Sequence, residues 1–183
     1  MTTVLYQQPR PRRPLAWRTL LAGGVGVGVI AFTAAFELPK RLVWNASASV
    51  PIGLYAVRDD ARIRRGVTVV VEPPEPLATF LADGGYLPRG VPLLKRVEAL
   101  PGATVCRHEL VVSVDGEPRA LARERDRFGR PLPVWSGCRD VGEGELFLLN
   151  VESDGSLDGR YFGPIAASSV VGRAAPLFVR EER

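Results

Sequence analysis

The stretch PLLKRVEALPG, residues 92–102, indicates the kind of fold that this chain adopts. Its apolar residues extend over Pro92–Leu100, the length of a buried strand, and Pro101-Gly102 then marks a turn. Runs of the same kind recur between turn signals, at Gly53–Val57, Val67–Glu72, Glu109–Val114, Leu146–Asn150 and Ser169–Val179. The pattern predicts a mainly β fold, an antiparallel domain with long loops.

The segments between these runs are expected to be irregular. The chain contains 19 glycines and 16 prolines, a composition that favours turns over a helical bundle. Asp115-Gly116 is a typical hairpin turn, and Leu77–Ala82 is a plausible helix. The charged, Gly/Pro-rich segment Arg119–Cys138 is interpreted as an excursion from the domain.

An uncharged segment near the N-terminus separates this domain from a basic tail. Thr19–Phe36 carries no charge, and as a helix of about 1.5 Å per residue it would be just long enough to cross a bilayer core. We therefore expect a basic tail at 1–18, one transmembrane helix at 19–38 and a folded domain at 39–183. A cleaved signal peptide and a buried core helix are the alternative interpretations.

The charge distribution bears on location and partners. The four arginines of residues 1–18 have no acidic counterpart there, and the rest of the chain has equal numbers of basic and acidic residues. This local basic cluster does not indicate nucleic-acid binding. By the positive-inside rule it predicts a single-pass protein of the inner membrane, with residues 1–18 in the cytoplasm and the folded domain in the periplasm.

Cys106 and Cys138 are the only cysteines of the chain. In an oxidising compartment they are candidates for one disulfide, which would close a loop of about 31 residues and contribute roughly 3–4 kcal/mol. Two unrelated free thiols remain the alternative. Two cysteines and the single His108 lack the spacing of a zinc site, so no metal is expected, and no cofactor motif is present.

Lys95 is unusual because nearly all the positively charged residues of this chain are arginines. The only other lysine is Lys40. Lys95 lies among Leu93, Leu94 and Val97, where burial would disfavour the charged amine. A lysine can lose its proton in this way, whereas a guanidinium cannot. Lys95 is therefore a candidate general base, and a surface lysine on an edge strand is the alternative.

A serine is the natural partner of such a base. His108 stands alone between charged neighbours and is expected to be a solvated surface residue, so a Ser-His-Asp triad is not supported. In NASASVPIGLY, residues 45–55, Ser47 and Ser49 are separated by a single residue. Alternate residues of an extended loop point the same way, so both hydroxyls could address one carbonyl oxygen. A Ser-Lys dyad is the chemistry that these residues favour.

Three segments together resemble a known family. SASVPIGLY is similar to the Ser-x-Ser-Met-Pro box of the bacterial type I signal peptidases, LLKRVEALPG to their lysine box, and GSLDGRYFGPI to their Ser-x-Asp-Ser-Arg box. The boxes occur in family order within residues 45–172. GYLPRG, DRFGRPLPVWSGC and RYFGP further resemble the conjugative-transfer, TraF-like branch.

The resemblance implies a role for each matching position. Ser49 matches the nucleophile and Lys95 the general base. Ser47 matches a serine whose hydroxyl completes an oxyanion hole with the Ser49 backbone N–H. As plainer alternatives, Ser47 could be a turn residue and Lys95 could lie on the surface.

Three further positions match the supporting part of the family site. Ser156 matches a serine that orients the lysine, and Asp158 and Arg160 match a bracing pair whose aspartate is sometimes counted as catalytic. A turn role for Ser156 and a purely structural ion pair at Asp158 and Arg160 stay open. The chain departs from the family at Val50, where Met is usual, and at Gly159, where Ser is usual.

The function implied is a membrane-anchored serine endopeptidase that removes a signal or propeptide segment from exported proteins. Its substrate would be an exported preprotein, in this branch a conjugative prepilin, met at the lipid bilayer. The acyl-enzyme could be released by water or by the substrate's own amino terminus, which gives a cyclic product. A non-catalytic membrane-tethered β module that scaffolds a secretion or pilus assembly is the main alternative, and a soluble self-cleaving repressor is a weaker one.

Overall fold

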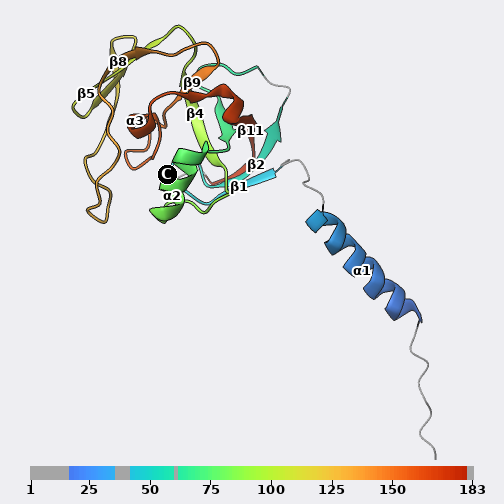
Figure 1. The fold of residues 1–183 in the computed structure, drawn as a ribbon. Helices are drawn as coiled ribbons and strands as arrows, with labels where there is room; N and C mark the ends of the chain where they lie inside the picture. The colour runs from blue at the N-terminus through green and yellow to red at the C-terminus, as the bar shows by residue number, and fades with distance from the viewer. Residues whose placement is uncertain (1–16, 36–41, 60–61, 181–183) are drawn as a thin grey trace, which may run out of the picture. The chain divides into compact units, whose positions relative to one another are not determined.

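The computed structural model describes residues 17–35, 42–59 and 62–180 (Figure 1). The chain divides into two compact units, Met1–Pro39 and Lys40–Arg183. The described part of the first unit is one helix, α1 (Trp17–Ala35).

Helix α1 covers most of the segment that was predicted to span a membrane. Its large apolar side chains are exposed, among them Leu20, Val25 and Ile30. In the part of the chain that the structure describes, no helix combines the length and the hydropathy that a membrane span requires. The predicted transmembrane helix is therefore not confirmed. Most of the predicted basic tail and the end of the predicted span lie outside the described residues.

The second unit is built mainly of antiparallel strands, as predicted. Its larger sheet has the order β1-β2-β11-β3-β4-β9-β10, and its smaller sheet has the order β7-β6-β5-β8. The strands of the larger sheet are β1 (Leu42–Asn45), β2 (Gly53–Arg58), β3 (Thr68–Val71), β4 (Leu93–Ala99), β9 (Glu145–Leu148), β10 (Ile165–Ala166) and β11 (Val170–Val179). Those of the smaller sheet are β5 (Thr104–His108), β6 (Val111–Val114), β7 (Glu117–Leu121) and β8 (Gly137–Asp140).

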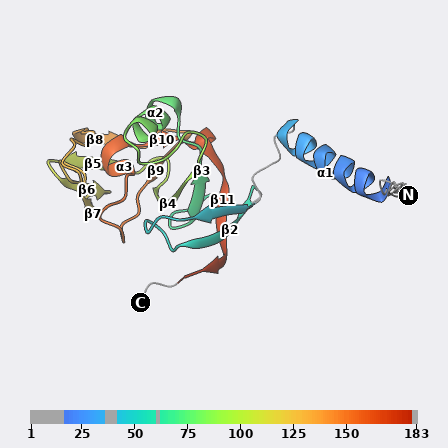
Figure 2. The ribbon, with the colours of Figure 1, turned by 90° about the horizontal axis from the view of Figure 1, so that it is seen from below.

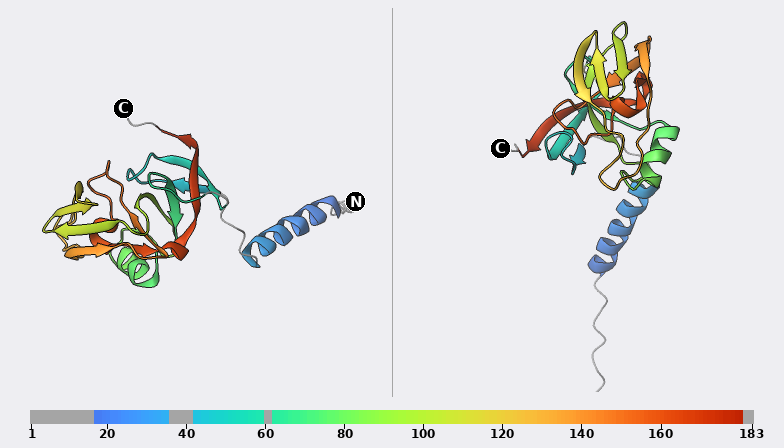
Figure 3. Two further views of the ribbon diagram at one scale, coloured as in Figure 1. Left: turned by 90° about the horizontal axis from the view of Figure 1, so that it is seen from above. Right: turned by 90° about the vertical axis from the view of Figure 1, so that its left-hand side faces the viewer.

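Short helices complete the domain. They are α2 (Glu75–Asp83), α3 (Gly159–Phe162) and the 3₁₀ turn η1 (Ala167–Ser169). Figures 2 and 3 place the small sheet at one end of the domain, and β1, β2 and the end of β11 at the other. Helices α2 and α3 lie between these two ends (Figure 2).

The central strands of the larger sheet form the core. Val69, Val70 and Val71 of β3 are fully buried, as expected where both faces of a strand are covered. Val70 belongs to one apolar cluster with Leu94, whereas Val69 and Val71 belong to another with Val97. Strand β4 therefore contacts apolar residues on both faces, and its polar side chains Lys95 and Glu98 are buried.

A buried carboxylate shows how this strand accommodates charge. Glu98 of β4 is 3% exposed, and its Oε1 accepts hydrogen bonds from Arg65 Nη2 at 2.8 Å and from Arg119 Nε at 2.7 Å. A buried charge of this kind is tolerable only with such partners. Lys95, three residues earlier on the same strand, has no comparable contact among the described carboxylates.

The predicted strands correspond to β2, β3, β4, β6, β9 and β11, and the predicted helix corresponds to α2. Asp115 and Gly116 form the predicted two-residue turn, with positive φ angles of 50° and 82° between the paired residues Val114 and Glu117. Strands β1, β5, β7, β8 and β10 were not predicted. The excursion Arg119–Cys138 is less irregular than expected, since it includes the end of β7 and the start of β8.

Candidate active site

The first part of the candidate site is the serine loop, residues 45–51, which connects β1 to β2. Strand β1 ends at Asn45, and β2 begins at Gly53. Val50 packs against the apolar cluster that includes Leu94, the neighbour of Lys95 on β4. The hydroxyl of the buried Tyr55 donates a hydrogen bond to the Pro51 carbonyl at 2.7 Å. The loop is thus fixed against the sheet at its C-terminal end.

The two serines of the loop are in contact. Ser47 Oγ and Ser49 Oγ are 3.2 Å apart. Ser47 is exposed and Ser49 is half-buried, so both can be reached from solvent. The expectation that the two hydroxyls point the same way is consistent with this contact.

Asn45 holds the loop from inside. Its side chain is buried, with 6% of the residue exposed. Its amide nitrogen donates to the carbonyls of Ser47, Val50 and Pro51 at 2.8, 2.9 and 3.1 Å. Its carbonyl oxygen accepts from the backbone N–H of Ser47 at 3.2 Å and from the Ser47 hydroxyl at 3.0 Å. Asn45 was not singled out in the sequence, although asparagine before a turn commonly bonds the backbone two residues on.

The second part is the lysine cluster: Lys95, Ser156, Asp158 and Arg160. Lys95 is in the middle of β4, paired with Val69 of β3, and is 4% exposed. Its Nζ donates a hydrogen bond to Ser156 Oγ at 2.8 Å. Ser156 is itself buried, at 3% exposure. The structure thus brings together the two residues for which the resemblance implied a base and the serine that orients it.

Burial changes the proton affinity of this amine. Desolvation lowers the pKa of Lys95 to about 8; the charge of Asp158 opposes this change and the charge of Arg160 adds to it. Removal from water disfavours the ammonium form, and no carboxylate among the described residues bonds the amine directly to restore it. A substantial fraction of Lys95 is therefore neutral near pH 8, as a lysine base requires.

Asp158 and Arg160 form a fully buried ion pair. The Arg160 Nε and Asp158 Oδ1 atoms are 3.2 Å apart, and neither side chain is exposed. Asp158 also caps α3 by accepting from the Arg160 backbone N–H at 3.2 Å, and it accepts from the Asn150 N–H at 3.0 Å. Arg160 Nη2 donates to the carbonyls of Asn150 and Ser153. The pair therefore fixes the segment that carries Ser156.

Arg107 supports the same segment from the small sheet. It is 1% exposed, and its Nη1 donates to the Arg160 carbonyl at 2.6 Å. Its guanidinium also lies 5.8 Å from the centre of the Tyr161 ring. Nothing in the sequence distinguished Arg107 from the many surface arginines.

Gly159 has no room for a side chain in this arrangement. A Cβ there would lie 2.5 Å from the Phe147 ring and 2.7 Å from the Leu148 carbonyl oxygen. The Gly159 carbonyl also accepts a hydrogen bond from Trp135 Nε1 at 2.9 Å. The family usually has serine at this position. Here close packing leaves no space for a serine side chain.

The two parts of the site are not joined by a hydrogen bond. Within residues 42–59 and 62–180, no hydrogen bond connects Ser49 to Lys95. Ser49 bonds Ser47, and Lys95 bonds Ser156. Val50 of the serine loop packs against the apolar cluster that includes Leu94 of β4.

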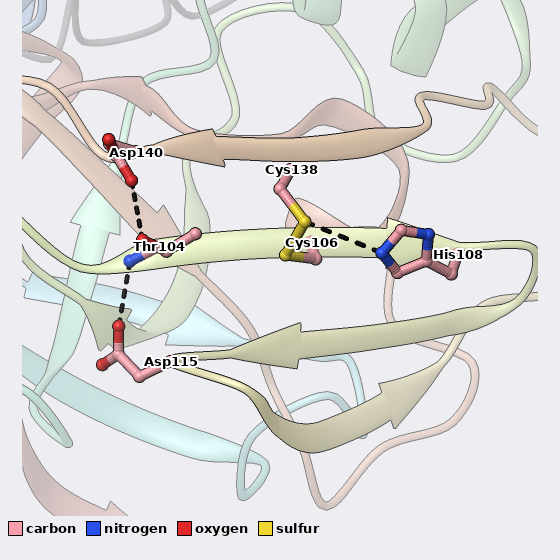
Figure 4. Close-up of a disulfide and its surroundings, with 6 residues drawn as sticks. All are labelled: Thr104, Cys106, His108, Asp115, Cys138 and Asp140. Carbon is pink, nitrogen blue, oxygen red and sulfur yellow. Dashed lines mark hydrogen bonds between the residues drawn. A yellow bond between two sulfur atoms is a disulfide. The ribbon is translucent and has the colours of Figure 1, made fainter.

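Cys106 and Cys138 form a disulfide in the small sheet. They are directly paired residues of β5 and β8, with Cα atoms 4.0 Å apart. Figure 4 shows His108, two residues after Cys106 on the same face of β5, with its ring directed at the disulfide. Its Nε2 is 3.6 Å from Cys138 Sγ. Since sulfurs joined to each other are not thiolate ligands, this trio is not a metal site in its oxidised form.

The chain is similar in sequence to a family of peptidases and to proteins of plasmid transfer. Residues 15–179 match the family model described as signal peptidase, peptidase S26. A plasmid transfer protein TraF of Escherichia coli is 32% identical over 162 residues, which cover 82% of this chain and 89% of the relative. A probable conjugal transfer protein TraF of Sinorhizobium fredii is 37% identical over 171 residues, covering 87% and 86% of the two chains.

Another relative and one solved structure are also similar to this chain. A conjugal transfer protein TraF of Agrobacterium fabrum is 36% identical over 146 residues, which cover 73% of this chain and 80% of the relative. Among solved structures, a signal peptidase I from Enterococcus faecalis is matched with a TM-score of 0.38 and 20% identity. That match covers 62% of this chain and 97% of the other.

Proposed function

Because this chain belongs to the signal peptidase family, peptidase S26, we propose that it is a serine endopeptidase in which Ser49 is the nucleophile and Lys95 the general base. The observation that carries the proposal is the burial of Lys95, which lowers its pKa to about 8. A buried lysine without a bonded carboxylate is costly, and such a cost is typical of functional sites.

The reaction begins with the neutral amine. As the Ser49 oxygen attacks the carbonyl carbon of the scissile peptide bond, its proton passes to Lys95 Nζ. The carbonyl electrons move to the oxygen, and the Ser49 backbone N–H and the Ser47 hydroxyl stabilise the resulting oxyanion. Ser156 keeps the amine in position throughout, since it accepts one of the lysine hydrogens.

Collapse of this intermediate releases the amine of the C-terminal fragment, which takes the proton from Lys95. The N-terminal fragment stays bound as an ester of Ser49. Water then attacks the ester with Lys95 again as the base, and the free carboxylic acid leaves. The amino terminus of the substrate could replace water and give a cyclic product. Mass spectrometry would recognise this product because its mass is lower by one water than that of the linear cleaved fragment.

The substrate is an exported protein with a segment to be removed, and more narrowly a precursor of a conjugative pilus or mating channel. The names of the TraF relatives, which are plasmid transfer and conjugal transfer proteins, support this choice. The Cys106–Cys138 disulfide supports an oxidising compartment outside the cytoplasm, such as the periplasm.

The experiment is labelling of the full chain with an acylating, serine-directed probe, followed by mapping of the labelled residue. We expect the label on Ser49, and we expect its rate of formation to fall by about a thousandfold or more in Lys95→Ala, because nucleophile and base act as a unit. Ser49→Ala should abolish the label.

Two matched variants control for loss of a serine and of a lysine as such. Ser113→Ala changes a serine of the small sheet, and Lys40→Ala changes the only other lysine. Both should label at the wild-type rate. Labelling of Ser49 that persists in Lys95→Ala would exclude the dyad, and a wild-type chain that does not label would favour the non-catalytic scaffold.

A further inference from the structure

The side chain of Asn45 is hydrogen-bonded to the serine loop at several points. Five contacts of 2.8–3.2 Å join its side chain to Ser47, Val50 and Pro51. All of them lie within six residues along the chain. The side chain is therefore the internal support of the loop that carries both hydroxyls.

The orientation of the Asn45 amide follows from its partners. The three backbone carbonyls around one end can only accept hydrogen bonds, so the NH₂ group must face them. The opposite end faces the Ser47 backbone N–H, which can only donate. The side-chain oxygen therefore lies beside Ser47, and the exchange of O and N that often leaves an amide ambiguous does not arise here.

This orientation determines where the two serine hydrogens point. The Ser47 hydroxyl is 3.0 Å from the Asn45 oxygen, which has no hydrogen, so Ser47 must donate to it. A hydroxyl has one hydrogen. In the 3.2 Å contact between the serines, Ser47 can then only accept, and Ser49 must donate.

The hydrogens thus form a directed chain from Ser49 to Ser47 to Asn45. In this arrangement the Ser49 proton is directed at Ser47, and the Lys95 amine is bonded to Ser156. The Ser47 hydrogen is likewise occupied and is not available to an oxyanion. The reactive groups are all present, but in this resting state the Ser49 proton does not point to the Lys95 amine.

We propose that Asn45 is a positioning residue that holds this resting state, and that the carbonyl oxygen of a bound peptide substrate releases it. The inference rests on the proposed function. The substrate oxygen competes with Asn45 for the Ser47 hydrogen. When Ser47 turns its hydrogen to the substrate, the directed chain to Asn45 is broken, and the Ser49 hydroxyl can rotate to turn its proton to Lys95 Nζ. Ser49 Oγ then bonds the carbonyl carbon, the proton passes to the amine, and the oxygen that gains the electrons accepts the Ser47 hydrogen.

A double-mutant cycle tests whether Asn45 acts through Ser47. The rate of Ser49 acylation by the serine-directed probe is measured for wild type, Asn45→Ala, Ser47→Ala and the double variant. Ser47→Ala should lower the rate by about 10- to 100-fold, because it removes an oxyanion donor. Asn45→Ala removes the acceptor that competes with the substrate for the Ser47 hydrogen, so it should raise the rate by about tenfold. In the Ser47→Ala background Asn45→Ala should change the rate by less than about threefold, because coupled residues are not additive.

Tyr55→Phe is the matched control. It removes a hydrogen bond to the Pro51 carbonyl in the same loop without touching Ser47. A purely structural support of the loop should act additively, so this change should have the same effect on the rate with and without Ser47. Additive effects of Asn45→Ala, or a wild-type rate in that variant, would overturn the role of Asn45.

Neutron diffraction of the wild-type chain gives an answer that does not depend on any variant folding. The deuterium of Ser47 should lie toward the Asn45 oxygen and that of Ser49 toward Ser47. A Ser49 deuterium directed at Lys95 would overturn the resting state while leaving the proposed function intact. A wild type that the probe does not label at all would overturn the proposed function, and this inference with it.

Discussion

The serine loop and the lysine cluster differ in their exposure to water. Ser47 is exposed, and the loop is held by neutral hydrogen bonds from Asn45 and Tyr55. The lysine cluster is almost dry, since its four residues are each at most 4% exposed. A nucleophile must meet its substrate, whereas a lysine base must be kept from water to be neutral. Under the proposed function, access to the nucleophile and desolvation of the base would come from separate elements.

The two parts also differ in the charge that they contain. The described contacts of the serine loop involve no ionised group, whereas the lysine cluster has an amine and a buried ion pair. Changes in the lysine cluster should therefore alter stability most, and changes in the serine loop should alter the rate with smaller effects on folding. The stability half of this contrast can be broken or sharpened by the following changes, from the largest expected effect to the smallest, and the double-mutant cycle at Asn45 and Ser47 addresses the rate.

Asp158→Ala should be the most destabilising single change. It leaves the guanidinium of Arg160 buried without its carboxylate, and breaking such a pair costs about 3–5 kcal/mol. Urea unfolding followed by circular dichroism measures the loss. Glu152→Ala is the control, since it breaks the exposed contact with Arg96 and should cost less than about 1 kcal/mol. Equal losses in the two variants would contradict the account.

Replacing both Cys106 and Cys138 by Ser should lower the free energy of unfolding by about 3–4 kcal/mol, by the chain-entropy model for a loop of this length. Labelling of Ser49 should persist in the folded variant, because the disulfide is in the small sheet. Reduction of the wild type with a dithiol should reproduce the shift in unfolding and have no effect on the double variant. A dithiol effect of equal size in both chains would show another cause.

Gly159→Ala should cost about 1–3 kcal/mol, the usual effect of overpacking a dense region. The new methyl group would meet the Phe147 ring and the Leu148 carbonyl. Gly155→Ala, in the preceding loop where a Cβ would meet nothing within 4 Å, is the control. Thermal unfolding compares the two, and a smaller loss at Gly159 than at Gly155 would contradict the packing seen here.

Lys95→Met should inactivate the protein and yet stabilise it by about 1–2 kcal/mol at pH 7. Depression of the pKa from 10.5 to about 8 means that a charged Lys95 costs about 3 kcal/mol below pH 8, and the unpaired Ser156 hydroxyl offsets part of the gain. Unfolding of both chains by urea at a series of pH values measures the difference.

The sign of the pH effect is fixed by linkage. Between pH 8 and 10.5 the unfolded chain binds more protons at Lys95 than the folded chain does, so the wild type gains stability as the pH rises through this range. The advantage of Lys95→Met should therefore shrink over the same range. An advantage that does not change with pH would mean that the lysine is not desolvated.

Much of this arrangement could be predicted from the sequence, because it depends on patterns that are local in the chain. Six strands and α2 followed from apolar runs between turn signals. The burial of Lys95 followed from its apolar neighbours on β4. The pairing of Cys106 with Cys138 also agrees with the sequence-based interpretation. The roles of the family residues remain predictions.

The features that could not be predicted depend on contacts between distant segments. Arg107 donates to a carbonyl 53 residues away, and no local pattern marks it as buried. The short edge strands β1 and β10 contain too few residues to show alternation. The lack of space at Gly159 is due to Phe147 and Leu148 on another strand. The predicted membrane span is not confirmed, and the end of that predicted span lies outside the described residues.

The central claim is that the Lys95 amine is neutral at moderate pH, and its pKa can be measured directly. The chain has only two lysines, so a heteronuclear NMR titration of their Cε resonances gives two curves, and Lys95→Met identifies the relevant one. The account predicts a midpoint near pH 8. A midpoint at the ordinary value of about 10.4 would contradict it, since a charged amine could not accept the Ser49 proton.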